Sequence, residues 1–166
     1  MVSLITILLL SQLDHFGFDA ISSPQTAGVA FQCTVYAYDS FNNVVDYNGS
    51  AEVFATPGTQ YGWQQVNFTS GMWQGQFTAT LASNYTITCR DYNVPAHTGE
   101  SNSVLFNTNT PYKVLAILPG ETYIQGIESG KEDDVIPQVA GDTFNIEIYY
   151  TDQWSNLINT GNDACQ

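Results

Sequence analysis

The sequence has few basic residues. Three Lys and Arg stand against sixteen Asp and Glu, which gives a formal net charge of −13. Nucleic acid would repel such a chain, which has no basic patch from which counterions could be released on binding. We therefore exclude nucleic acid as a partner and expect a soluble, well-hydrated surface.

Long hydrophobic segments are also missing. The one strongly apolar run, residues 1–10, is too short to span a bilayer as a helix, so the sequence predicts no transmembrane span. The run has no Lys or Arg before it and no small-residue cleavage pattern after it. Two interpretations of residues 1–12 stay open, a degenerate signal peptide and the chance start of a reading frame, and we set this segment apart from the fold.

Motifs of catalysis are absent as well. The only histidines are His15 and His97, and the sequence contains no GxSxG, HExxH, CxxC or phosphate-binding loop. Nothing in the sequence combines a nucleophile, a base and an orienting group. We therefore expect a protein that is not an enzyme and that has no cofactor.

No long segment rich in Ala, Leu, Glu and Lys is present, whereas Thr, Val, Tyr and Phe are plentiful. Short alternating segments separated by turn signals recur through residues 13–107 and predict an all-β, antiparallel sandwich. The strongest strand prediction covers residues 29–39. Its period of two places four apolar side chains on the inward face: Phe31, Cys33, Val35 and Ala37.

An internal repeat organises the chain. Residues 24–50 align without a gap on residues 137–163, and eight positions are identical: Pro24/Pro137, Gln25/Gln138, Ala27/Ala140, Gly28/Gly141, Phe31/Phe144, Tyr36/Tyr149, Asp39/Asp152 and Asn43/Asn156. A repeat of this period indicates an array of similar domains. We predict a sandwich at 13–107, a linker at 108–112 and a truncated second copy at 113–166. In that copy the inward face would carry Phe144, Ile146, Ile148 and Tyr150, and a strand edge would stay open.

Several of these segments resemble a known family. The segments DHF at 14–16, SSPQTAG at 22–28, FTSGMW at 68–73 and LPGET at 118–122 resemble bacterial immunoglobulin-like tandem repeats of secreted and cell-surface proteins. The resemblance implies an immunoglobulin-like sandwich followed by an incomplete second copy. It also implies an extracellular or cell-surface spacer, stalk or adhesive element, with neighbouring repeats as partners and a surface protein or glycan as a further one. Such a widespread fold brings no site with it.

The resemblance also implies a disulfide between Cys33 and Cys89, since the corresponding strands of immunoglobulin-like sandwiches face each other across the core. The alternative is two separately buried thiols. Cys165 has no evident partner in the sequence.

Two Asp-to-Asn segments have alternative interpretations. Asp39 with Asn43, and Asp152 with Asn156, are typical of a structural turn, because both residue types hydrogen-bond to their own backbone. Their oxygens are also of the type that Ca²⁺ prefers, so calcium is the alternative.

Aromatic side chains suggest a second function. Tyr36, Tyr38, Tyr61 and Trp63 could together form a platform on which sugars stack. The alternative function is therefore a carbohydrate-binding accessory module of a secreted hydrolase. The alternation of the strand at 72–81 turns Trp73 inward, so we assign that side chain to the core.

Overall fold

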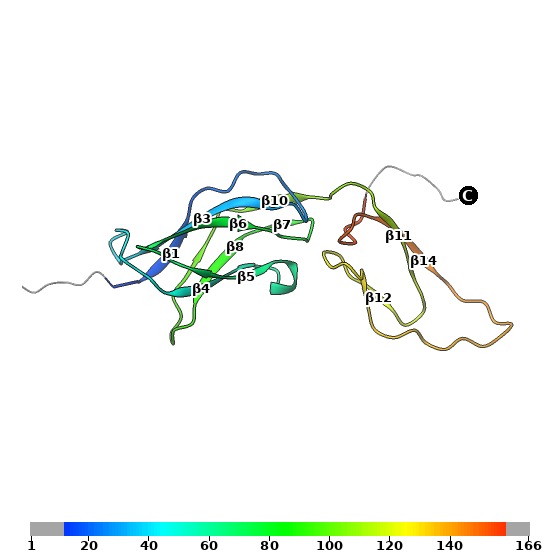
Figure 1. The fold of residues 1–166 in the computed structure, drawn as a ribbon. Coiled ribbons are helices and arrows are strands. Elements are labelled where there is room, and N and C mark those ends of the chain that lie inside the picture. The colour runs from blue at the N-terminus through cyan, green and yellow to red at the C-terminus, as the bar shows by residue number, and fades with distance from the viewer. Residues whose placement is uncertain (1–11, 159–166) are drawn as a thin grey trace, which may run out of the picture.

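The computed structural model describes residues 12–158. Figure 1 shows a β-sandwich joined end to end with a smaller second unit. We call residues 12–107 the first unit and residues 113–158 the second unit. Nearly all regular structure is strand, which confirms the predicted all-β class, and the described residues form one short 3-10 helix, η1 (Thr59–Tyr61). No helix in residues 12–158 is long and apolar enough to cross a membrane.

One sheet of the first unit has three antiparallel strands in the order β1–β3–β6. The strands are β1 (His15–Phe18), β3 (Phe31–Tyr38) and β6 (Met72–Phe77). The long central strand β3 pairs with β1 on one side and with β6 on the other. In this sheet β1 is therefore an edge strand.

A four-stranded antiparallel sheet in the order β5–β4–β8–β9 shares one core with this sheet. Its strands are β4 (Ser50–Ala55), β5 (Trp63–Asn67), β8 (Ile87–Asp91) and β9 (Thr98–Glu100). A third, small sheet consists of β2 (Gln25–Thr26), β7 (Asn84–Tyr85) and β10 (Val104–Asn107). In this sheet β10 pairs in parallel with β2 and antiparallel with β7.

The core of the first unit lies between the inward faces of β3 and β4. The predicted inward face of β3 is confirmed, since Phe31 is 7% exposed and Cys33, Val35 and Ala37 are 1% exposed or less. Alternate residues of β4 are fully buried: Ala51, Val53 and Ala55. Burying one large apolar side chain stabilises a fold by about 1.5–3 kcal/mol. The sandwich is therefore held together by the period-two pattern of its strands.

The second unit contains two strand pairs. Its strands are β11 (Lys113–Ile117), β12 (Thr122–Tyr123), β13 (Lys131–Glu132) and β14 (Glu147–Thr151). Both pairs, β11 with β14 and β12 with β13, are antiparallel. Tyr123 of β12 stacks on Tyr149 of β14, with ring centroids 4.0 Å apart. The β12–β13 hairpin therefore covers one face of the β11–β14 pair.

The predicted inward face of the second unit is wrong for the described residues. Phe144, Ile146, Ile148 and Tyr150 are 45–52% exposed. No sheet faces these side chains within residues 12–158, and the β12–β13 hairpin covers the opposite face instead. Among the described strands, β14 pairs only with β11, so the edge that β3 uses to bind β6 is open in β14.

Candidate functional site

The turn at 152–156 contains the most deeply buried polar side chains of the second unit and meets the first unit. Asn156 is fully buried. Its Nδ2 donates to the carbonyl oxygen of Thr80 at 2.8 Å, and its Oδ1 accepts from the backbone N–H of Ala82 at 2.8 Å. Thr80 and Ala82 belong to the first unit, so a single amide group joins the two units with a matched donor and acceptor.

The linker between the units takes part in the same junction. Asp152 Oδ2 accepts from the backbone N–H of Asn109 at 3.0 Å, and Asn109 Nδ2 donates to the carbonyl oxygen of Ala27 at 3.2 Å. Thr80 Oγ1 donates to the carbonyl oxygen of Gly126 at 2.5 Å. The junction therefore combines the end of the sandwich, the linker and two segments of the second unit.

Trp154 lies against a glycine of the first unit. A Cβ atom on Gly28 would lie 2.0 Å from Nε1 of Trp154, and Gly28 has a φ of 77°, which side chains disfavour. Both the close approach of the indole and the backbone conformation thus require glycine at this position. The end of the first unit is shaped to receive the turn of the second.

The turns at 39–43 and 152–156 have the same internal hydrogen bonds. In each turn the aspartate Oδ1 accepts from the backbone N–H groups two and four residues later, all at 2.9 Å. The residue before the asparagine has a left-handed φ in both, 62° at Asn42 and 60° at Ser155. The shared sequence therefore specifies one local conformation, a turn closed on its aspartate.

These bonds bear on the two interpretations of the Asp-to-Asn segments. Hydrogen bonds from Asn43, first from its backbone, and from Phe41 lower the pKa of Asp39 below its usual value. The carboxylates of Asp39 and Asp152 thus face N–H donors rather than further oxygen ligands. In the part of the chain that the structure describes, no three His, Cys, Asp or Glu side chains are arranged to hold a metal ion. The geometry favours the structural turn.

Cys33 and Cys89 lie on opposite sheets, β3 and β8, and both are buried free thiols. Burial, with a smaller contribution from Asp19, raises the pKa of Cys33 to about 12. Burial also raises the pKa of Cys89, and the neighbouring Cys33 adds to this. The predicted disulfide between them is therefore absent from this structure, and Cys165 lies outside the described residues.

The four candidate sugar-stacking residues do not form one platform. Tyr36 and Tyr38 lie on β3 with ring centroids 6.1 Å apart, and His15 stacks on Tyr38 at 5.4 Å. Trp63 lies on β5 in the other sheet, and Tyr61 is partly buried beside Gly126 at the junction. The structure brings together only the two β3 tyrosines, with His15 as a third ring.

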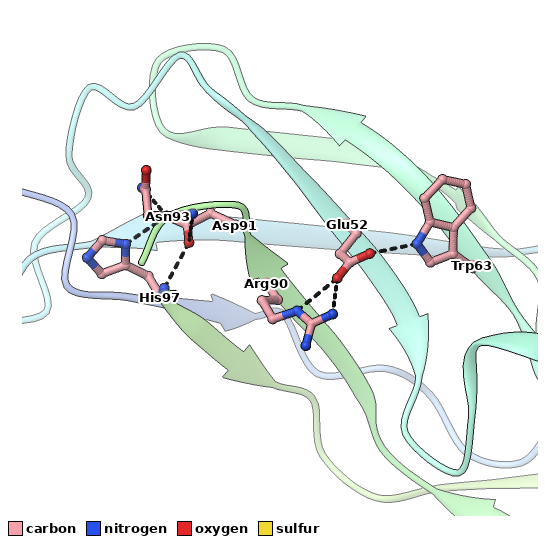
Figure 2. Close-up of polar contacts among 6 residues, drawn as sticks. All are labelled: Glu52, Trp63, Arg90, Asp91, Asn93 and His97. Carbon is pink, nitrogen blue, oxygen red and sulfur yellow. Dashed lines mark hydrogen bonds and ion pairs between the residues drawn. The ribbon is translucent and has the colours of Figure 1, made fainter. Parts of the chain in front are cut away.

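Figure 2 shows a buried carboxylate between two strands of the four-stranded sheet. Glu52 Oε2 accepts from Nε1 of Trp63 at 2.8 Å, and its Oε1 accepts from Nε of Arg90 at 2.8 Å. The Arg90 guanidinium also lies over the ring of Phe54, 5.2 Å from its centroid. The indole N–H of Trp63 is thus already bonded to a side chain of the same chain.

A second buried carboxylate, Asp91, closes the loop between β8 and β9 (Figure 2). Its Oδ2 bonds to Nδ1 of His97 at 2.7 Å and to Nδ2 of Asn93 at 2.6 Å, and its Oδ1 accepts from the backbone N–H of His97 at 2.9 Å. Burial alone would raise the pKa of Asp91, but these hydrogen bonds outweigh it and lower the pKa. His97 therefore holds a loop in place.

Glu52, Arg90 and Asp91 were not among the candidate residues predicted from the sequence. One feature of the sequence could have pointed to them, because Arg90 is one of only three Lys and Arg residues in a strongly acidic chain. Such a residue at the end of a strand is a good candidate for an internal ion pair. No feature of the sequence could have predicted the hydrogen bonds from the second unit to Thr80 and Ala82, because these two residues take part through their backbone groups.

The lowered pKa of Asp91 predicts how the stability of the fold depends on pH. Its pKa in the folded chain lies below the 3.8 of the free side chain, so its contribution is fully present above about pH 5 and is lost as the pH falls through 3.8 and below. We expect Asp91→Asn to lower the free energy of unfolding by about 2 kcal/mol at pH 7 and to flatten this acid dependence. Urea unfolding between pH 7 and pH 3 tests this, with Asp134→Asn on an exposed loop as control. Equal acid dependence in the Asp91→Asn variant and the parent chain would contradict it.

The fold and the junction define an antiparallel β-sandwich whose end binds a turn of a following unit. No family model matches this chain, and no curated protein matches its sequence.

Proposed function

We propose that this chain is a non-catalytic part of a tandem array of immunoglobulin-like units, which acts as a spacer, stalk or adhesive element outside the cell. The observation that carries the proposal is the fully buried Asn156, which joins the second unit to Thr80 and Ala82 of the first. A buried amide with all its groups bonded fixes the orientation of what it joins. Units held in this way project their ends at a defined distance, which a spacer or stalk requires.

The strand pairing supports the interpretation of the second unit as another copy. Lys113 pairs with Thr151 in the β11–β14 pair, as His15 pairs with Tyr38 in the β1–β3 pair. Thr151 and Tyr38 each directly precede the aspartate of a closed turn. The same order of strand, partner strand and turn thus occurs in both units.

The arrangement of the first unit supports the immunoglobulin-like assignment. Two sheets share one core, the second strand of one sheet carries Cys33, and the facing sheet carries Cys89 on β8. Antiparallel pairing of β4 with β8 and parallel pairing of β2 with β10 fit such a sandwich.

The distribution of charge supports a solvated location outside the cell. All three basic side chains are engaged within the protein: Arg90 bonds to Glu52, Lys131 to Glu121 at 2.6 Å, and Lys113 to the backbone carbonyl groups of Glu128 and Gln153. The free charges of the surface are therefore mainly acidic, which favours hydration over aggregation.

Asn156→Ala tests the proposal. The substitution leaves Thr80 O and Ala82 N without their partner, which costs about 1–3 kcal/mol at a buried site, so we expect the junction to loosen. In ¹⁵N relaxation measurements the two units of the parent chain should share one rotational correlation time. The units of the Asn156→Ala variant should have two.

Asn43→Ala is the matched control. Asn43 occupies the same place in the exposed turn of the first unit, so its loss should leave the shared correlation time unchanged. Independent tumbling of the two units in the parent chain would refute a fixed spacer.

A further inference from the structure

The turn at 39–43 offers to solvent the groups that the turn at 152–156 buries. Phe41, which corresponds to Trp154, is 75% exposed, and Val44 after the turn is 50% exposed. Asn43, which corresponds to the fully buried Asn156, is exposed, and its Nδ2 bonds only to the carboxylate of Asp39, at 3.2 and 3.3 Å. An exposed aromatic ring beside an amide with bonding capacity to spare is typical of a contact surface.

The described structure contains the surface that fits this turn. At the far end of the first unit, Gly28 leaves space for an aromatic ring, and Thr80 O and Ala82 N form an acceptor and donor pair for one amide. In this molecule that surface is already occupied by Trp154 and Asn156. Any unit that receives the turn at 39–43 must therefore be another one.

We propose that the turn at 39–43 docks on the end of a further sandwich unit built like residues 12–107. Phe41 lies against the residue at the position of Gly28, and Asn43 bonds to the backbone groups at the positions of Thr80 and Ala82. The proposal rests on the proposed function, because it extends the observed junction to the opposite end of the first unit. Both ends of the first unit are then contact surfaces of a single type.

The test uses an extended chain in which a second copy of residues 12–112 precedes His15. Tyr112 of the added unit is then followed by His15 as it is by Lys113 in the natural linker, and these two residues start equivalent strand pairs. Ser40→Thr in the added unit gives its turn peptide a different mass. Hydrogen exchange measured by mass spectrometry then reports each turn separately.

We expect peptides covering residues 39–45 of the following unit to exchange at least about tenfold more slowly than those of the added unit, whose turn has no unit ahead of it. Asn43→Ala in the following unit should remove this difference, while the peptides of its β4 and β8 stay protected and show that it is folded. Equal exchange of the two turns overturns the proposal. Protection that persists in the Asn43→Ala variant overturns the proposed contact as well.

The same experiment separates this inference from the proposed function. Peptides covering residues 152–158 report the junction that the structure contains. If these peptides are protected and those of the following turn are not, only the docking of the turn at 39–43 fails. If peptides 152–158 also exchange freely, the proposed array fails with it.

Discussion

Phe31→Ala lowers the free energy of unfolding of the first unit by about 3–5 kcal/mol, whereas Phe144→Ala at the same repeat position changes that of the second unit by less than about 0.5 kcal/mol. Phe31 is 7% exposed and packs against Phe77 and Phe106, with ring centroids 6.0 and 5.7 Å away. Its removal leaves a cavity among aromatic rings. Phe144 is 47% exposed, so its removal leaves no cavity.

The two variants can be compared directly, because the original residue, its position in the repeat and the substitution are the same in both. Urea unfolding followed by tryptophan fluorescence gives both free energies, since Trp73 packs against the core of the first unit and Trp154 of the second unit lies against Gly28 at the junction. Equal losses in the two variants would show that a partner covers Phe144 in solution and would contradict the open face of the second unit.

The second large effect is expected when a Cys165→Ser variant is refolded under oxidising conditions. We expect Cys33 and Cys89 to form a disulfide, with oxidised glutathione as the electron acceptor, and the bond to raise the free energy of unfolding by about 4 kcal/mol. Both thiols are buried in the one core that the two sheets share, on β3 and β8. Because burial raises the pKa of both, almost no thiolate is present in the folded protein to attack an oxidant. The bond should therefore form during refolding and hardly at all in the native chain.

Mass spectrometry without reduction distinguishes the outcomes. The refolded variant should be lighter by two hydrogen atoms and should resist alkylation under denaturing conditions, whereas the native chain treated with the same oxidant should be alkylated at both cysteines. Two free thiols after oxidative refolding would leave the alternative, two separate buried thiols. Cys33→Ser serves as the control, since it leaves Cys89 without a partner.

The strands of the first unit could be predicted from the sequence because their signal is local. Alternating side chains of one strand point to opposite sheet faces, so Phe31, Cys33, Val35 and Ala37 had to share a face. The core that they enter was also foreseeable, since only one face is continuously apolar. For the second unit the same reasoning placed alternate side chains such as Phe144 and Ile146 on one face, but it wrongly predicted that this face is buried. The reason is that no pattern within a strand shows what packs against it.

Local sequence alone also determined the conformation of the two turns. An aspartate that accepts from the N–H groups two and four residues later needs only its own segment, so the turns at 39–43 and 152–156 closed in the same way. Their surroundings came from the tertiary structure. Asn156 is buried because residues far away in the chain, Thr80 and Ala82, bring backbone groups to it, while Asn43 is exposed.

The sequence by itself determined the β class, the inward face of β3, the repeat and the closed turns, since each depends on side-chain period or on hydrogen bonds within a few residues. The tertiary structure alone decided that the sugar-stacking candidates separate onto β3, η1 and β5 and that Glu52 and Asp91 are buried with partners. It also decided that the turn at 152–156 forms the junction between the two units. These properties depend on contacts between segments distant in the chain, and burial and pairing are set by the whole packing rather than by any one segment.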